Sequence, residues 1–484
     1  MSIWDYSSKT NRKIKELKED ITVDTLIIGG GLSGLNLAYY LKDEDNVCLV
    51  EGNIIGHGVT LRSTAKINYF QECIYTDIIK SSNYDNACSY LKSQLLAIKE
   101  LKNIIENGKI DCDFKRVDSY VFANSSDEVD RLKEEIKFLK ENNIDVKKKK
   151  LKLDVEVHDS YYVSDTYIFN PIKYLNDLYN ILKDKIDIYE NTKIINIEKE
   201  EDKYICYTNN NHKIICNNVI FMCHYPYFTI PYLTPIKCSI EKSYMIVSKV
   251  KKEEDYTCIN TNYPIYSKRY YSDGENIYQI SLAKSNKLNK VKDEKYFFDR
   301  VKEIFKLKEK DIVMKYSNSD IMTPDHMPYI GKIKENMYIS IGYNTWGMTN
   351  SVLGAYIIND LLNNKENEYV DVFNPNRVDM VSFIGYMFEN IVSFVENKII
   401  KNKDYYSDNV KFIEEYGNSI GVYTDKEGKE YKVYNKCPHL GCSLNFNEVE
   451  KTWDCPCHSS RFDLNGKCIK GPALKDITYK SNCD

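Results

Sequence analysis

Glycine and proline are scarce in this sequence, at 20 and 11 of 484 residues, and we find no internal repeat and no low-complexity segment. No run of 18 apolar residues occurs, which argues against insertion into a membrane. The polar start Met1-Ser-Ile-Trp-Asp lacks the apolar stretch of a secretory signal. A net charge of −4 argues against a nucleic-acid partner. We therefore expect a soluble, cytoplasmic protein.

The chain of 484 residues is too long for a single hydrophobic core, and its length predicts two or three domains. The 15 cysteines fall into two groups. Four lie within residues 437–457, and the others are scattered singly, as is typical of buried, reduced thiols. The clustered cysteines therefore indicate a separate functional segment near the C-terminus.

Histidine is scarce as well, with seven in the chain, yet two histidines stand beside the clustered cysteines. The two segments are Cys437-Pro-His439-Leu-Gly-Cys442 and Cys455-Pro-Cys457-His458. A Rieske [2Fe–2S] centre binds one iron through two thiolates and the other iron through two imidazoles. The first segment contains a C-x-H pair and the second a C-x-x-H pair, each with one further cysteine, so each loop can supply one ligand to each iron. We therefore predict that the cluster ligands are Cys437, His439, Cys455 and His458. A structural zinc site is the alternative, although zinc motifs usually pair Cys with Cys and His with His.

The residues that follow carry a family pattern. Ser459–Asp463 and Gly471-Pro-Ala473 lie at spacings typical of Rieske domains. The whole segment resembles the disulfide-bearing Rieske type of respiratory chains. This resemblance implies a disulfide between Cys442 and Cys457, which would be a local exception in an otherwise reduced protein.

The same resemblance bears on the reduction potential of the cluster. Ser460 stands where a serine hydroxyl bonds to a cluster sulfur, whereas Phe462 stands where the respiratory type has a second donor, a tyrosine. Hydrogen bonds to the sulfurs raise the potential. We therefore predict a potential below that of the respiratory type, within the Rieske range of about −150 to +300 mV.

A second motif lies near the N-terminus, where the apolar run Val23–Ile28 leads into Gly29-Gly-Gly31-Leu32-Ser33-Gly34. A helical pattern follows over 35–42, and a second apolar run over 47–50 ends in Glu51. This order of strand, glycine turn, helix, strand and acid is typical of dinucleotide-binding folds. We expect Gly29 to permit the turn, Gly31 to admit a pyrophosphate and Gly34 to allow close helix packing. Glu51 is expected to bind ribose hydroxyls.

Two later segments favour FAD over NAD. The stretch from Gly56 to Lys66 resembles the flavin-contacting loop of the D-amino-acid oxidase and glycine oxidase group. Thr323-Pro-Asp-His-Met-Pro-Tyr-Ile-Gly331 resembles another segment of that group, and a strand over 337–341, a loop and a helix over about 350–362 follow it. In that group the helix N-terminus points at the pyrimidine edge of the flavin. The FAD contacts that the motifs and the resemblance imply are Gly29, Gly31, Leu32, Ser33, Gly34, Glu51, Arg62, Ser63, Thr64, Ala65, Gly342, Thr345, Trp346, Gly347, Met348 and Thr349.

The chain thus resembles an FAD-dependent oxidoreductase of the D-amino-acid oxidase superfamily fused to a C-terminal Rieske domain. The resemblance implies an α/β fold, in which a Rossmann-like FAD domain is interleaved with an α+β substrate domain, and a small all-β Rieske domain. We expect an N-terminal extension over 1–20, the oxidoreductase region over 21–375, a linker helix over 376–408 and the Rieske domain over 409–484. The expected FAD domain comprises about 21–80, 150–235 and 315–375, and the substrate domain about 81–149 and 236–314. Residues 193–207 and 212–223 alternate like the two strands of an accessory hairpin.

Candidate substrate contacts are few. Relatives that oxidise amino acids hold the carboxylate with the planar fork of an arginine, and Arg269 lies near the corresponding segment. A surface arginine beside Lys268 is the alternative reading of Arg269. Lys66 follows the small-residue loop and is expected to approach the flavin or the substrate, unless it pairs with a carboxylate.

Together these motifs predict a dehydrogenase-like FAD oxidoreductase that oxidises a small amine or amino-acid-like substrate. Electrons would pass from FAD to the [2Fe–2S] cluster and on to an unknown acceptor, although the sequence is equally compatible with the reverse flow. If the two histidines faced solvent, they would form the exit for electrons. The alternatives are an electron-transfer or redox-sensing module without an organic substrate, and a zinc-containing flavin oxidase that uses oxygen directly.

Overall fold

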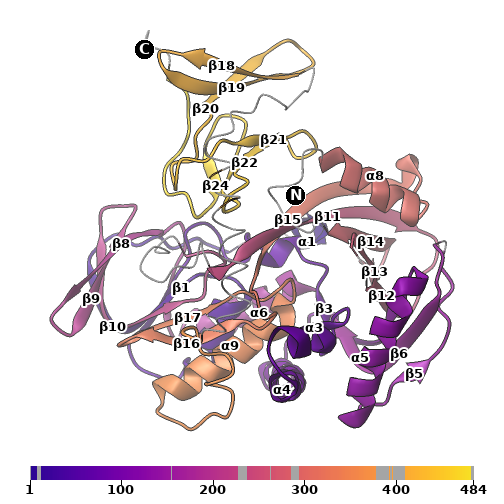
Figure 1. Cartoon of the computed structure of the whole chain (residues 1–484). Helices are drawn as coiled ribbons and strands as arrows, with labels where there is room; N and C mark the ends of the chain where they lie inside the picture. The colour runs from indigo at the N-terminus through magenta and orange to yellow at the C-terminus, as the bar shows by residue number, and fades with distance from the viewer. Residues whose placement is uncertain are drawn as a thin grey trace.

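The computed structural model describes residues 2–7, 12–153, 155–226, 237–261, 263–284, 294–377, 392, 395 and 409–480. Its strands form one eight-stranded and one nine-stranded sheet, followed by a three-stranded and a four-stranded sheet near the C-terminus. The two large sheets form the body of the molecule, and the C-terminal strands sit above it (Figure 1). The predicted fold class, an α/β region followed by a small all-β domain, is confirmed.

The first large sheet has parallel strands at its centre. These are β10 (Lys213–Phe221), β1 (Ile21–Ile28) and β2 (Val47–Val50). The flanking strands are β7 (Asp187–Tyr189), β17 (Met337–Ile341), β16 (Tyr329–Lys334) and the hairpin of β8 (Ile194–Glu200) and β9 (Lys203–Thr208). Helices α2 (Leu32–Tyr40) and α9 (Gly347–Leu362) pack against each other and against this sheet. The ends of β1 and β10, residues 26–28 and 219–221, and the whole of β2 are apolar and buried, as expected where parallel strands are covered on both faces.

The expectation for residues 193–223 is wrong in one respect. Residues 193–207 contain both strands of the hairpin, β8 and β9, whereas β10 is a central strand parallel to β1. Only the first residues of β10 pair with β9, and the last ones pair with β17 in parallel. The residues after β10 therefore emerge at the carboxyl edge of the parallel strands, where α/β folds bind their ligands.

The second large sheet is mostly antiparallel. In order, its strands are β15 (Ile312–Met322), β11 (Ser239–Val250), β14 (Ile277–Lys284), β13 (Ile265–Ser272), β12 (Tyr256–Asn260), β4 (Lys115–Ala123), β6 (Asp159–Ile168) and β3 (Lys66–Ile67), with β5 (Lys147–Lys148) paired to β6. The two sheets interleave along the chain. However, β6 and most of β15 belong to this second sheet although the expected ranges 150–235 and 315–375 placed them in the FAD domain, because they pair with β4 and β11.

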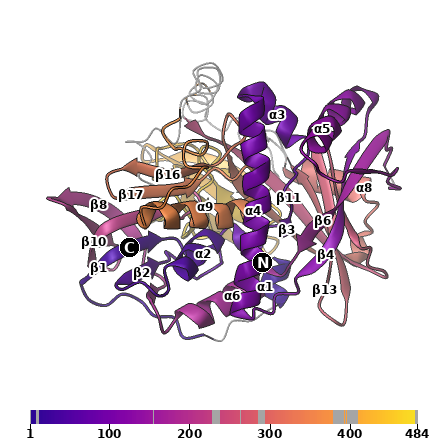
Figure 2. The same ribbon diagram turned by 90° about the horizontal axis from the view of Figure 1, so that it is seen from below.

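A long helix, α4 (Tyr84–Gly108), runs between the two sheets (Figure 2). The Asn83 side chain accepts a hydrogen bond from the Asn86 backbone at its start, and Lys109 ends it in the left-handed conformation. One face of α4 packs against α9 and α3, so it joins the two halves of the body. The other helices of the body are α3 (Ile74–Ser81), α5 (Val129–Glu141), α6 (Pro171–Leu182) and α8 (Glu294–Ile304), with 3₁₀ turns η1 (Thr60–Arg62), η2 (Ser126–Glu128) and η4 (Glu309–Asp311).

The N-terminal segment packs into the body. Helix α1 (Ile3–Ser7) carries Trp4, which is fully buried. The indole Nε1 of Trp4 donates to the Ser63 carbonyl at 2.9 Å, and its ring meets Tyr271 edge-on at 5.1 Å. The predicted N-terminal extension therefore supports the loop that ends at Ala65.

The C-terminal domain consists of two small antiparallel sheets. The first contains β18 (Val410–Glu415), β19 (Asn418–Thr424) and β20 (Glu430–Tyr434), and the second contains β21 (Asn445–Asn447), β22 (Thr452–Asp454), β23 (Arg461–Phe462) and β24 (Cys468–Lys470). Its core includes Trp453 and Phe462, both fully buried. A Cβ at Gly421 would lie 2.7 Å from the Trp453 ring, so glycine allows the two sheets to meet closely.

Most of the predicted linker helix over 376–408 lies outside the described residues. Across the ranges that the structure describes, we find no helix that combines the length and the apolar character needed to cross a membrane.

Candidate cofactor sites

A cavity of about 790 Å³ opens at the carboxyl edge of the parallel strands. This volume lies in the upper part of the range of about 300–1,000 Å³ for ligand pockets. The glycine turn after β1, Glu51 after β2 and residues 221–226 after β10 form one side of it. The second large sheet forms another side, with Ser243, Met245 and Ser267. The cavity therefore lies between the two sheets.

The geometry of the glycine turn fits a dinucleotide. Gly29 has a φ of +118°, and a Cβ there would lie 2.7 Å from the Met222 carbonyl oxygen. A Cβ at Gly34 would lie 1.8 Å from the carbonyl oxygen of Gly29, so α2 can pack on the turn only with glycine at that position. At Gly31 a Cβ would meet only Thr60 Oγ1, at 3.5 Å, which leaves its backbone open to the cavity. The N-terminus of α2 then begins at the cavity wall, where an anion is favoured.

Glu51 lines the same cavity. Its carboxylate accepts hydrogen bonds from the backbone of Gly30 at 2.7 Å and of Asn53 at 2.8 Å. Burial raises the pKa of Glu51, although these two bonds oppose the shift. The acid is thus fixed beside the glycine turn, at the place where ribose hydroxyls would meet it.

Fourteen predicted FAD contacts line the cavity; they are Gly29, Gly31, Leu32, Ser33, Glu51, Arg62, Ser63, Thr64, Ala65, Gly342, Thr345, Trp346, Gly347 and Met348. The other two do not line it. Gly34 packs against the turn, and Thr349 lies one position beyond, in α9, with its buried hydroxyl unpaired among the described residues. Ala65 and Thr345 have positive φ angles of 51° and 70°, a strained conformation for such residues that is typical of ligand-binding loops.

Lys66 reaches the cavity from β3 and is buried. Its Nζ donates to Ser267 Oγ at 2.5 Å and lies 5.2 Å from the centre of the Trp346 ring. Burial lowers the pKa of Lys66 to about 8. No ion pair forms between Lys66 and a carboxylate of the described residues within 4.0 Å. Lys66 thus lies at the cavity wall, and its approach to flavin or substrate stays a prediction.

The structure gives Arg269 a different role from the predicted carboxylate contact. Its side chain is only 2% exposed and does not line the cavity, so it is not a surface arginine either. The guanidinium donates to the backbone carbonyls of Thr64 at 2.9 Å, Ala65 at 2.7 Å, Phe169 at 3.2 Å and Tyr270 at 3.1 Å. Through Nε and Nη1, Arg269 therefore holds the loop of residues 62–65, which we call the cavity loop, and it lies behind the cavity wall.

In the C-terminal domain, two loops bring the predicted cluster ligands together. The thiols of Cys437 and Cys455 are buried and in hydrogen-bond contact. The rings of His439 and His458 lie 4.9 Å apart, centre to centre, and nearly perpendicular. The Nδ1 atom of His439 is buried and has no hydrogen-bond partner among the described residues. A buried, unpaired ring nitrogen beside two thiols fits a metal ligand.

Protonation supports the same reading. Contact with Cys455, followed by N–H groups of His439 and Leu440 and the Ser460 hydroxyl, lowers the pKa of Cys437 to about 7. Burial lowers the pKa of His439 to about 4 and, together with the charge of His439, that of His458 to about 3. The same contact raises the pKa of Cys455, so the two thiols share a proton in the absence of metal. Metals require thiolates and neutral imidazoles, so the shifts of Cys437 and the two histidines favour ligation, and a bound metal would displace the shared proton. The four residues therefore fit a [2Fe–2S] centre.

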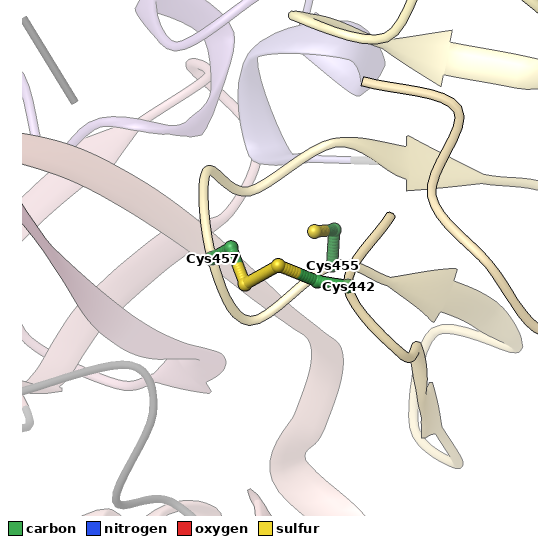
Figure 3. A group of neighbouring side chains, drawn as sticks. All are labelled: Cys442, Cys455 and Cys457. Atoms are coloured by element: carbon green, nitrogen blue, oxygen red, sulfur yellow. A yellow bond between two sulfur atoms is a disulfide. The ribbon is translucent and has the colours of Figure 1, made fainter. Parts of the chain in front are cut away.

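Cys442 and Cys457 form the predicted disulfide (Figure 3). Their sulfur atoms and that of Cys455 all lie within 4.8 Å of one another. Since disulfide sulfurs are not thiolates, these three cysteines do not form a metal-binding set. Their closeness shows that the disulfide packs against Cys455, one of the predicted cluster ligands. The bond joins the two ligand loops.

The histidines face the body of the molecule. His458 is 6% exposed, and its ring lies 5.4 Å from the ring of Tyr225, while that of His439 lies 6.4 Å from it. Tyr225 itself lines the cavity. His458 is thus buried against the body, whereas His439 is partly exposed, so of the two histidines only His439 reaches solvent. Sequence reasoning missed Tyr225 because β10 was read as half of a hairpin; a residue just after a central parallel strand is the signal that marks it.

A buried charge network holds the C-terminal domain in place. Glu450 accepts from Arg62 at 2.5 Å and from the Ser317 backbone at 2.9 Å, and pairs with Arg461 at 3.0 Å. Asp454 pairs with Arg461 at 2.8 Å and with Lys242 at 2.8 Å. Arg62 lies in the cavity loop, and Ser317 and Lys242 lie in the second large sheet. The network therefore ties the C-terminal domain to both the cavity loop and that sheet.

The fold and the two sites define an oxidoreductase with a dinucleotide cofactor and an iron–sulfur domain. Residues 24–361 match the model of the family described as FAD dependent oxidoreductase, and residues 396–480 match that of the Rieske [2Fe-2S] domain. The chain belongs to the FAD dependent oxidoreductase family, carries a C-terminal Rieske domain, and uses FAD and a [2Fe–2S] cluster as cofactors.

Three comparisons with known proteins agree. The chain is 28% identical over 479 residues to the Rieske 2Fe-2S iron-sulfur protein YhfW of Bacillus subtilis (strain 168), covering 95% of this chain and 94% of that protein. Its fold is similar to that of glycine oxidase from Geobacillus kaustophilus, with a TM-score of 0.61, 16% identity, and coverage of 74% of this chain and 99% of that one. L-amino acid deaminase from Proteus vulgaris is similar with a TM-score of 0.61, 13% identity, and coverage of 77% and 100%.

Proposed function

We propose that this protein oxidises a small amine or amino-acid-like substrate at FAD and passes the electrons through the Rieske centre to an acceptor outside the chain. When bound, FAD supplies two-electron oxidation and the [2Fe–2S] cluster supplies one-electron transfer. The observation that carries the proposal is the position of Tyr225, which lines the FAD cavity and touches both histidine rings. Tyr225 thus lies between the FAD cavity and the two histidines.

The wall of the cavity opposite the glycine turn supports a substrate site. It carries Ser243, Ser267 and Lys284 from the second large sheet and Lys66 beside Trp346. Lys284 is paired with Glu241 at 3.1 Å and with Glu72 at 3.5 Å, so its charge is already balanced. Within the described part of the chain, the Lys66 ammonium has the Ser267 hydroxyl as its hydrogen-bond partner and no carboxylate. A small polar substrate with an anionic group suits these residues.

The similarity to glycine oxidase and to an L-amino acid deaminase supports the amine class, since both of those proteins act on amino acids by name. The contact of both histidine rings with Tyr225, which lines the cavity, favours the histidines as the entry for electrons from the flavin side. The acceptor would then meet another part of the C-terminal domain.

An anaerobic spectroscopic titration tests the proposal. Glycine, L-proline and other small amino acids and amines are added to the purified protein, and visible and EPR spectra are recorded. We expect loss of the oxidised flavin absorption followed by a reduced Rieske signal. A Cys455→Ser variant is the matched control, and it should lose the EPR signal but still show flavin bleaching. If no amine in the panel bleaches the flavin while dithionite does, the amine proposal is refuted and the redox-module alternative is favoured.

A further inference from the structure

The Rieske domain supplies part of the wall of the FAD cavity. Its residues there include Arg461, Asp463, Lys467 and Lys470, together with Gly471 and Pro472. They lie in or next to β23 and β24, which are more than 400 residues from the glycine turn in the sequence. The yellow domain sits directly above β1 and β15 in the overall view (Figure 1). The cofactor cavity is therefore bounded by two domains.

Direct contacts tie this segment to the dinucleotide end of the cavity. Lys193 Nζ donates to the Ala473 carbonyl at 2.7 Å, and Asn53 Nδ2 donates to the Ile469 carbonyl at 3.5 Å. Lys193 and Asn53 both line the cavity, and the Asn53 backbone holds the Glu51 carboxylate. Residues 467–473 thus lie over the end of the cavity that the glycine turn and Glu51 mark.

Lys470 is the unusual member of this segment. No carboxylate among the described residues lies within 4.0 Å of its Nζ, and the acids that interact with it at longer range are Asp320 and, more weakly, Asp454. The neighbouring cations Arg461 and Arg62 are both engaged with Glu450. Burial, followed by Arg461, lowers the pKa of Lys470 to about 7. Lys470 is half-buried at the cavity wall, and a cation that is partly desolvated without a close counter-ion favours an anion beside it.

We propose that the Rieske domain completes the FAD-binding site, with Lys470 binding the diphosphate of the cofactor and residues 467–473 closing the cavity over it. The diphosphate is the charged group of oxidised FAD, so it is the anion that this cation would meet in the cavity. Helix α2 would face the diphosphate from the body and Lys470 from the Rieske domain. The inference goes beyond the proposed function, because it holds whichever substrate is oxidised.

Binding measurements on the full-length protein test this inference. FAD is removed, and the dissociation constants of FAD and ADP are measured for the wild type, Lys470→Gln, Lys470→Arg and Lys475→Gln. Lys475 is an exposed lysine of the same domain that does not line the cavity, so it is the matched control. We expect Lys470→Gln to weaken FAD by about 10- to 100-fold, as for one charge-assisted hydrogen bond, and to weaken ADP similarly. Lys470→Arg should restore most of the affinity, and Lys475→Gln should bind as the wild type does.

The Rieske EPR signal of each variant shows whether the domain is folded. Equal FAD affinity in Lys470→Gln and the wild type would overturn the inference. If Lys470→Gln loses FAD affinity, Lys470→Arg does not recover it, and both variants keep the Rieske EPR signal, then the positive charge is not what binds FAD. Since these measurements use no substrate, they are independent of the amine titration, and either proposal can fail while the other stands.

Discussion

Replacing Glu450 by Gln should loosen the Rieske domain from the body of the protein. The Glu450 carboxylate is 7% exposed, and it receives the guanidinium groups of Arg62 at 2.5 Å and Arg461 at 3.0 Å. It also accepts from the backbone and the hydroxyl of Ser317. Glutamine keeps the size of the side chain but removes the charge that both arginines face. Breaking one member of a buried ion pair leaves the others uncompensated.

The pKa of Glu450 gives the magnitude. Burial raises it, but Arg461 and Arg62 outweigh burial and lower it from 4.5 to about 2. At about 1.4 kcal/mol per pH unit, this shift corresponds to about 3 kcal/mol of stabilisation at neutral pH. A carboxylate with a lowered folded-state pKa contributes fully above its unfolded value and loses the contribution as pH falls towards 2. The difference between the wild type and Glu450→Gln should therefore shrink by about half at pH 3.

Chemical denaturation followed by tryptophan fluorescence measures this difference at pH 7 and pH 3. Glu448→Gln is the control, because Glu448 is exposed and lies two positions away. We expect Glu448→Gln to denature within about 0.5 kcal/mol of the wild type. The reasoning is refuted if Glu450→Gln behaves like Glu448→Gln at pH 7, or if its deficit is as large at pH 3 as at pH 7.

Four further outcomes are expected. Arg269→Met should lower the free energy of unfolding by about 3 kcal/mol, because it leaves four backbone carbonyls unpaired, whereas the exposed Arg116→Met should change it little; equal thermal denaturation of the two variants would contradict this. Phe462→Tyr should raise the cluster potential in a potentiometric titration, and a wild-type potential already at the respiratory value would argue against the reasoning. The double variant Cys442→Ser/Cys457→Ser should be less stable by about 3 kcal/mol, since the disulfide spans 15 residues, and a denaturation midpoint insensitive to reductant in the wild type would speak against this. Lys66→Met should have a free energy of unfolding about 2–3 kcal/mol higher than the wild type at pH 7, because a buried lysine with a lowered pKa destabilises the fold while it is charged. This difference should disappear between pH 8 and 10.5, and a difference independent of pH would exclude burial as the cause.

Local motifs allowed most of the two cofactor sites to be predicted from the sequence. The glycine turn is fixed by sterics within a few residues, as the close approach of Gly34 to Gly29 shows. The cluster ligands lie in two short loops, and their disulfide partner cysteines occupy matching places in those loops. Such sites depend on spacing along the chain, which the sequence contains directly.

Features that depend on distant partners could not be predicted. Arg269 looked like a substrate ligand because its residue type suits a carboxylate, but its neighbours are carbonyls of loops far away in the chain. β10 was read as part of a hairpin because alternation does not distinguish a parallel partner from an antiparallel one. The contact of Tyr225 with the two histidines needs the relative position of two domains, and no local pattern contains that information.

The hydrogen bonds from Arg269 to the cavity loop have a consequence for folding during synthesis. Arg269 follows Ala65 by 204 residues, so at about 5–20 residues per second the ribosome reaches it about 10–40 s after making the loop. Until then, the carbonyls of Thr64 and Ala65 can bond only to water or to transient partners. A nascent chain that ends before β13 therefore contains the glycine turn but lacks the arginine that holds the neighbouring loop. The cofactor-binding site is complete only late in synthesis.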